Sequence, residues 1–296
     1  FRSRTWLDGL DALQDPRIHT LRCPSGMNAS AIQNLSLSKS RGDYLLFLSG
    51  DSAIVDSDWL ENLLNHAQRP EVGAVGPKII NADGKIQSAG LVLGLNGPAN
   101  SAFVGQDAYA PGYMHRLEID QNYSAVSGTC LMVRREIFEH VGGFAEEGPL
   151  SHYSDVDICL KIRQAGFLVV WTPHTIVLQS EKSVRAQSTD LQISSEEALQ
   201  LRDREHALYE KWLPAIAHDG AYNENLSLAG QGFEIETNID LVTQPLPWRP
   251  VPVALAIAAD PYGCGHYRII HPGQRMAIEG VADVRVSNRH YTPVEM

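Results

Sequence analysis

The chain has 296 residues and a net charge of −11, from 24 Lys and Arg against 35 Asp and Glu, and its 44% hydrophobic and 20% charged content excludes wholesale disorder. The acidic balance argues against non-specific binding of nucleic acid or anionic lipid, although it leaves room for a local phosphate pocket. Four separated cysteines without CxxC spacing exclude a zinc ribbon and favour a reducing cytoplasm, and no apolar run approaches the roughly 20 residues that span a bilayer.

The first part of the chain alternates helix and strand patterns. It begins without Met, with a helical pattern at Trp6–Leu13 and a short strand at Ile18–Arg22, whereas an α/β domain normally opens with a buried strand. Asp43–Ser49 is almost continuously apolar, which is typical of a strand buried on both faces of a parallel sheet. The other elements expected before residue 94 are helices at 29–40 and 56–67, the second capped near Ser57, and strands at 72–76 and 85–93.

The second part begins with a long segment, 94–122, that is rich in Gly, Pro, Asn and Tyr. So long a loop in a compact domain is usually functional or mobile. After it we expect strands at 125–134, 167–171 and 175–178, and helices at 136–141, 154–165 and 194–213. Residues 219–250 are polar and then Pro-rich, as in a linker, and a strand at 253–258 opens a second α/β unit. Together the two ends predict a fragment of a longer protein.

Asp51 follows the apolar strand at 43–49 and is preceded by Gly50. In open α/β sheets ligands bind beyond the carboxyl ends of the strands, and Gly50 would let the backbone approach a ligand closely. A carboxylate there can hold a divalent cation that neutralises a diphosphate. The alternative is a turn aspartate that satisfies its own backbone.

Asp155 and Asp157 stand at the start of the helix predicted at 154–165. They are two residues apart and therefore do not share a helix face. Asp155 lies in the first turn, where the helix dipole favours a carboxylate, so an ordinary cap is the simplest interpretation. Since Ile158, Leu160 and Ile162 indicate that the helix is otherwise packed, Asp157 is expected to point to a cleft.

Several motifs recur in the same order in one family. Residues 1 to about 230 resemble the family 2 glycosyltransferases of bacterial O-antigen and related polysaccharide assembly. The matching stretches in this sequence are Asn28–Asn34, Arg41–Leu48, Trp59–Glu61, Val72–Lys78, Asp83–Gly90, Asn122–Val126, Cys130–Arg135, Val141–Phe144, Asp155–Leu160, Trp171–Pro173 and Tyr222–Leu228.

The resemblance implies a glycosyltransferase A type α/β fold, with a mixed, mostly parallel sheet flanked by helices and the first strand missing here. It implies transfer of a sugar, with inversion, from a nucleotide-diphosphate donor to a hydroxyl of a glycan or lipid-linked glycan. An inverting displacement needs a base, and Asp155 matches that residue. It also needs positive charge on the leaving diphosphate, and Asp51 matches a ligand of Mg²⁺ or Mn²⁺.

The same resemblance places other residues near the donor. Asn34 and Arg41 match positions beside the nucleotide, although a helix-end contact is an equally simple interpretation. Gly128 matches a tight position near the donor sugar, with a strand bulge as its alternative. Gly50 and Asp157 complete the donor-binding residues that we expect. The implied location is the cytoplasm, with possible peripheral association with the inner face of the membrane.

Three positions depart from the family pattern. Ser49 replaces the first carboxylate of the DxD-like metal motif, and Ser154 precedes Asp155 where Glu or Asn is common. Counting from Pro173, Gln179 occupies the place of a histidine metal ligand, and an amide is a weaker, neutral ligand. These departures keep open a second hypothesis, a degenerate module that binds sugar nucleotide or glycan without turnover. A nucleotidyltransferase, which also uses a strand-end Asp and a metal, is a third.

We expect three segments: a glycosyltransferase A type domain at 1–230, a Pro-rich linker at 231–250, and the start of a second Rossmann-like glycosyltransferase domain at 251–296. The second unit carries Gly263-Cys264-Gly265 between a strand and a helix. A glycine-rich turn there can cradle phosphate, but the third glycine of the dinucleotide fingerprint is lacking. An ordinary strand-to-helix turn is the alternative.

Overall fold

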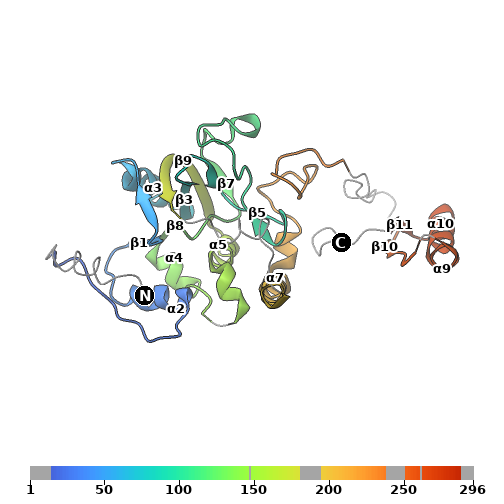
Figure 1. Cartoon of the computed structure of the whole chain (residues 1–296), viewed down its shortest axis with the longest axis horizontal. Coiled ribbons are helices and arrows are strands. Elements are labelled where there is room, and N and C mark those ends of the chain that lie inside the picture. The colour runs from blue at the N-terminus through green and yellow to red at the C-terminus, as the bar shows by residue number, and fades with distance from the viewer. Residues whose placement is uncertain (1–14, 147, 181–194, 238–250, 261, 288–296) are drawn as a thin grey trace.

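The computed structural model describes residues 15–146, 148–180, 195–237, 251–260 and 262–287 (Figure 1). The helix predicted at 6–13, most of the predicted linker and residues 288–296 of the second unit lie outside the described residues. The strand predicted at 18–22 does not form. The helix predicted at 29–40 runs over Ala29–Leu37 (α2), with the Asn28 side chain accepting the backbone N–H of Ala31 at its start.

A mixed seven-stranded sheet is built from strands between residues 44 and 179. Its main strand order is β1-β8-β3-β9-β2, with β4 on β3 and β7 on β9. The strands are β1 (Tyr44–Leu48), β2 (Ser52–Ile54), β3 (Val72–Ile80), β4 (Ile86–Ser88), β7 (Gln121–Tyr123), β8 (Cys130–Arg134) and β9 (Leu168–Gln179). The sheet and its flanking helices confirm the predicted α/β class.

The expectation of a mostly parallel sheet is wrong for the described strands. Within the seven-stranded sheet β3 and β9 pair in parallel, whereas β1, β2, β4 and β7 join the sheet through antiparallel pairs. The apolar run at 43–49 led to the error, because apolarity reports burial and not the direction of the neighbouring strand. Strand β1 pairs antiparallel with β8 and leaves Leu48 42% exposed.

Helices cover both faces of the sheet. On one face Leu63 and Ala67 of α3 (Trp59–Ala67) pack with Val75 of β3 and Met132 of β8. On the other face lie the helices α4 (Arg135–His140), α5 (Ser154–Gln164) and α7 (Ser195–Ile216), around Ala74 and the larger core. The alternation of side chains along β3 and β8 supplies both cores, which gives three layers.

The strands predicted separately at 167–171 and 175–178 are one strand, β9, of 12 residues. The register between β3 and β9 shifts opposite Pro77 and Lys78, which absorbs the Pro173 segment without ending the strand. A bulge is one of the places where a sheet tolerates proline, since proline cannot donate to the ladder. The continuous strand carries its last residue, Gln179, to the β2 edge.

The long segment at 94–122 is packed rather than free. It contains β6 (Ala99–Asn100), which pairs with β5 (Val92–Leu93), and a 3₁₀ turn at Tyr113–His115. The buried ammonium of Lys78 donates to the carbonyls of Ala108 at 2.9 Å and Leu117 at 3.0 Å. Burial lowers the pKa of Lys78 below its usual value. These two bonds hold the middle of the segment against the sheet.

The second unit is a strand–helix–strand. Strands β10 (Val253–Ile257) and β11 (Asp283–Ser287) pair in parallel. Between them run α9 (Gly263–Gly265), a π-helical turn at His266–Ile270 and α10 (His271–Ile278). A Cβ atom at Gly265 would lie 1.8 Å from the Asp260 carbonyl oxygen, so only glycine fits where the turn crosses the strand end.

No helix in the described part of the chain is both long and apolar enough to cross a membrane.

We expect Gly73→Ala to lower the free energy of unfolding by about 1–3 kcal/mol, as overpacking of a core does. A Cβ atom at position 73 would lie 2.4 Å from Cγ2 of Ile162 and 2.9 Å from Cβ of Phe167, where α5 passes over β3. Urea unfolding checks this. Gly220→Ala is the control, because its Cβ would meet its nearest atom, on Arg163, at an ordinary 3.5 Å. Equal midpoints for the two variants would contradict the packing.

Candidate active site

The turn between β1 and β2 presents Asp51. The backbone N–H of Ser49 donates to the Thr129 carbonyl at 2.8 Å, which ties the turn to the residue preceding β8. The Ser49 hydroxyl donates to Oδ1 of Asp51, and Nε2 of Gln179 donates to Oδ2 at 3.2 Å. Gly50 is exposed and has open space where a Cβ would stand. Asp51 is therefore oriented from two sides beside an unobstructed backbone.

Gln179 reaches Asp51 because of strand register. In the antiparallel β2–β9 pair Ser52 lies opposite Gln179, and the N–H of Ser180 donates to the Asp51 carbonyl at 3.2 Å. The other end of the Gln179 amide, Oε1, accepts the Thr129 hydroxyl at 3.3 Å. Both polar atoms of this side chain are thus engaged inside the protein.

Asp155 lies in the first turn of α5 and faces the same turn before β8. Its Oδ2 accepts the backbone N–H of Gly128 at 2.9 Å, and its Oδ1 accepts the N–H of Val156 at 2.9 Å. A Cβ atom at position 128 would lie 3.1 Å from Cβ of Asp155. Gly128 is a tight position, as predicted, and what it contacts closely is the Asp155 side chain.

Four of the residues singled out in the sequence therefore come together with one that was not. We name this group the Asp51–Asp155 cluster; its members are Asp51, Gly128, Thr129, Asp155 and Gln179. Thr129 carried no local signal, because its role arises from strands that are distant in the sequence. The cluster holds two carboxylates, and a displacement at a diphosphate ester needs groups of this type, one to take a proton and one to hold a cation.

The Asp51 carboxylate fits a divalent cation that takes its other ligands from a bound diphosphate and from water. Mg²⁺ is commonly bound through one or two carboxylates together with substrate phosphates and water, and Asp51 supplies one carboxylate. Gln179 does not fit the predicted ligand role in this geometry, because it turns nitrogen, not oxygen, toward Asp51. Within the described ranges no group of three or more His, Cys, Asp and Glu side chains could hold a metal ion by itself.

Two predicted nucleotide-binding residues lie elsewhere. Asn34 of α2 bonds to the carbonyl and N–H of Phe144, at 2.9 and 3.1 Å, and to the Glu146 carboxylate at 2.8 Å. This is the helix contact that was its alternative interpretation, and it secures the segment leading toward α5. Arg41 is exposed and precedes β1, whereas Asp51 follows that strand, so the two residues flank its opposite ends.

Asp157 is not part of the cluster, contrary to the expectation that it faces a ligand. Its side chain is fully buried between α5 and α7. Lys211 contacts Oδ1 at 2.6 Å, Trp212 Nε1 donates to the same oxygen at 2.8 Å, and Lys161 lies 3.0 Å from Oδ2. Burial raises the pKa of Asp157, but the hydrogen bonds from Lys211, Trp212 and Lys161 outweigh it and leave the pKa below its usual value.

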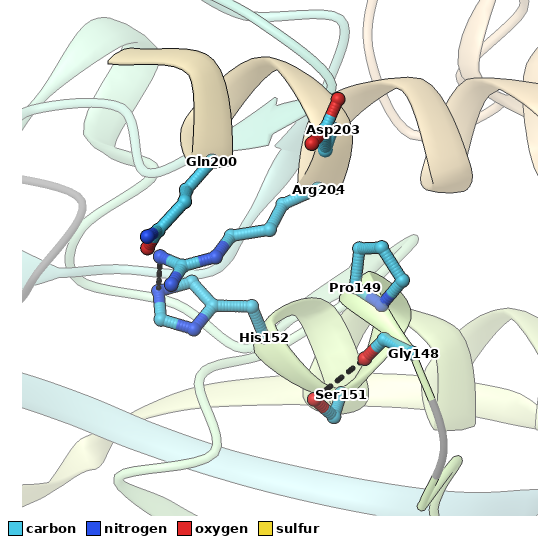
Figure 2. A pocket seen from close by; sticks show the side chains of 7 residues that line it. All are labelled: Gly148, Pro149, Ser151, His152, Gln200, Asp203 and Arg204. Atoms are coloured by element: carbon cyan, nitrogen blue, oxygen red, sulfur yellow. Dashed lines mark hydrogen bonds between the residues drawn. The ribbon is translucent and has the colours of Figure 1, made fainter. Parts of the chain in front are cut away.

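A hollow of about 290 Å³ lies between α7 and the 3₁₀ turn Pro149–Tyr153, which leads directly into α5 (Figure 2). Nη1 of Arg204 lies 3.0 Å from Nε2 of His152 across it. The other lining residues are Gly148, Pro149, Ser151, Gln200 and Asp203. Sequence reasoning missed this hollow, because its two walls are some fifty residues apart in the chain.

Comparison with known proteins assigns the family. Residues 2–142 match the family model described as Glycosyl transferase family 2. The chain carries a glycosyl transferase family 2 domain. It is 36% identical over 223 residues to uncharacterized protein y4gI of Sinorhizobium fredii, covering 75% of this chain and 24% of that protein. It is 34% identical over 225 residues to O-antigen biosynthesis protein RfbC of Myxococcus xanthus, covering 74% of this chain and 16% of that protein.

The chain thus spans about a quarter or less of the length of these two relatives. A solved structure, the mannosyltransferase PcManGT from Pyrobaculum calidifontis in complex with GDP-Man and Mn²⁺, aligns with a TM-score of 0.43 and 15% identity. The alignment covers 72% of this chain and 59% of that one.

We expect Asp157→Asn to lower the free energy of unfolding at pH 7 by roughly 2–4 kcal/mol, because it leaves two lysines beside a neutral group. The pKa of the Asp157 carboxyl in the folded protein lies below its ordinary value of 3.8. The difference in free energy of unfolding between wild type and Asp157→Asn is therefore fully present above pH 3.8. It is lost as the pH falls through the lowered folded pKa. Urea unfolding from pH 7 to pH 2 measures both effects.

Asp203→Asn, on the exposed surface of α7, removes the same charge without a buried partner and serves as the control. A wild-type advantage over Asp157→Asn that stays constant down to pH 2 would contradict the buried ion pair.

Proposed function

We propose that this family 2 domain is an inverting glycosyltransferase that moves a sugar from a nucleotide-diphosphate donor to a hydroxyl of a growing bacterial polysaccharide or O-antigen. The observation that carries the proposal is the Asp51–Asp155 cluster. It places two carboxylates on the two sides of one turn, each in a different hydrogen-bonded setting. The relationship to RfbC, which is named for O-antigen biosynthesis, supports the class of product.

In the proposed reaction the acceptor oxygen attacks the anomeric carbon of the donor sugar while the bond from that carbon to the diphosphate oxygen breaks. Asp155 takes the proton of the acceptor hydroxyl, and the electron pair of the broken bond leaves with the nucleoside diphosphate. The Gly128 N–H fixes the Asp155 carboxylate for this task. Asp51 would hold Mg²⁺ or Mn²⁺, which supplies the charge that stabilises the diphosphate.

The acceptor side is also a proposal. His152, which lines the hollow beside the start of α5, precedes Asp155 by three residues in the chain, and most of the other lining residues are polar. The hollow offers a place for part of a glycan or lipid-linked glycan acceptor. We propose that residues 1–230 form the catalytic domain, that 231–250 link it to a second transferase domain beginning at 251, and that the protein works at the cytoplasmic membrane face.

A second candidate function is a module that binds sugar nucleotide without turnover. It is favoured by the place of Ser49 and Gln179 at positions where the family pattern has a carboxylate and a histidine. In the structure both side chains donate to Asp51 instead of extending a ligand set. Donor hydrolysis or transfer by the full-length protein separates the two functions.

We expect Asp155→Asn to reduce sugar transfer at least about a thousandfold, because an amide cannot accept the hydroxyl proton. Folding and UDP binding should stay near wild type, since the amide oxygen can still accept the Gly128 N–H. Asp83→Asn, in an exposed turn, is the control. Sugar transfer at the wild-type rate by Asp155→Asn would contradict the assignment of Asp155 as the base. The anomeric configuration of the product, determined by NMR, tests inversion.

We expect Asp51→Asn to abolish the part of UDP affinity that depends on Mn²⁺, because a neutral amide holds the cation weakly. Calorimetric titration with UDP, with and without Mn²⁺, measures it. Asp56→Asn, two residues beyond β2 and exposed, should behave as wild type. If Mn²⁺ tightens UDP binding equally in Asp51→Asn and in wild type, the cation site is elsewhere.

A further inference from the structure

Thr129 contacts two residues whose side chains donate to Asp51, namely Ser49 and Gln179. Its carbonyl accepts the Ser49 N–H, and its hydroxyl donates to Oε1 of Gln179. Its own N–H donates to the Ser127 hydroxyl at 3.2 Å, and the Ser127 hydroxyl donates back to Thr129 Oγ1 at 3.2 Å. The Thr129 side chain is therefore held at its base and directed toward Gln179.

The orientation of the Gln179 amide follows from this contact. An ionised carboxylate is an acceptor only, so Asp51 can bind the nitrogen end of the amide and repels the oxygen end. The oxygen end then needs a donor on its other side. The Thr129 hydroxyl is that donor, and it accepts from Ser127 in turn. The Ser127, Thr129 and Gln179 side chains therefore each donate one hydrogen bond and accept one, and the series ends at the acceptor Asp51.

We propose that Thr129 is a positioning residue that acts on Asp51 through Gln179. Its hydroxyl keeps Oε1 of Gln179 turned away from Asp51, so that Nε2 holds the carboxylate in place for the cation and diphosphate. Gln179 then serves as a hydrogen-bond donor to Asp51 and not as a metal ligand. The expected effect on cation and diphosphate binding rests on the proposed function, whereas the Thr129–Gln179–Asp51 hydrogen-bond series rests on the geometry alone.

The expected effect is moderate. Groups that orient a metal-binding side chain commonly change metal affinity by about 10- to 100-fold when they are removed. Thr129 acts one hydrogen bond further away, so its loss should weaken Mn²⁺-dependent UDP binding by roughly three- to tenfold. UDP binding without Mn²⁺ should change by less than about twofold, because neither Thr129 nor Gln179 is proposed to contact the nucleotide.

The experiment titrates UDP, with and without Mn²⁺, into the full chain carrying Thr129→Val, Thr129→Ser, Gln179→Met or the Thr129→Val/Gln179→Met pair. Val removes the hydroxyl at nearly constant shape, whereas Ser retains it. We expect Thr129→Val to weaken Mn²⁺-dependent UDP binding by roughly three- to tenfold and Thr129→Ser to bind like wild type. The double variant should bind UDP no more weakly than Gln179→Met alone. Thr175→Val is the matched control, since Thr175 lies on β9, the strand of Gln179, and its hydroxyl donates to the Trp59 carbonyl of α3, away from Asp51.

Thr129→Val binding like wild type, or losing as much in the Gln179→Met background as alone, would overturn the inference. If Thr129→Val does not fold, Gln179→Met breaks the same hydrogen-bond series without changing the turn. A loss of Mn²⁺-dependent UDP affinity of at least about threefold then supports the inference, and a smaller loss overturns it. If Mn²⁺ does not tighten UDP binding by wild type, the metal part of the proposed function fails. The urea midpoints of the four variants then decide the linkage: non-additive shifts support it and additive shifts overturn it.

Discussion

The register of the β1–β8 ladder is the constraint on which the rest of the site depends. Leu48 pairs with Cys130, so the next residue outward, Ser49, meets Thr129 and the Asp51 turn lies against residues 127–129. A shift of one residue would turn the alternate side chains of β8 to the wrong faces and expose both cores. The burial of Leu131 and Val133 on one face and Met132 on the other therefore also fixes where Asp51 stands.

The Ser127–Thr129 turn then connects three elements that share no local sequence. Its glycine N–H holds the Asp155 carboxylate of α5, its threonine carbonyl holds the β1–β2 turn, and its threonine hydroxyl holds the end of β9. Helix α5 is secured separately by the buried contacts of Asp157 with α7. The first turn of α5 is thus fixed on both sides, with Asp155 toward the β8 turn and Asp157 toward α7.

The two acidic residues of α5 illustrate how environment divides similar groups into different roles. Asp155 is partly exposed and bonded to backbone N–H groups, and this setting supports its proposed role as the base. Asp157 is buried and surrounded by two ammonium groups and an indole, so it is committed to structure.

The amino-acid sequence by itself determined most helices and strands and the α/β class, and it singled out Asp51 and Asp155, because apolar periodicity and carboxylates at strand ends and helix starts are local patterns. The family resemblance added Gly128 and Gln179. The sequence did not determine that β1 pairs antiparallel with β8, since an apolar run carries no information on the direction of the neighbouring strand. It also misplaced Asp157, whose partners Lys211 and Trp212 lie more than fifty residues away. Only the tertiary structure brought Thr129 into contact with Ser49 and Gln179, two donors to Asp51, because hydrogen bonds across strands depend on register, which no local pattern encodes.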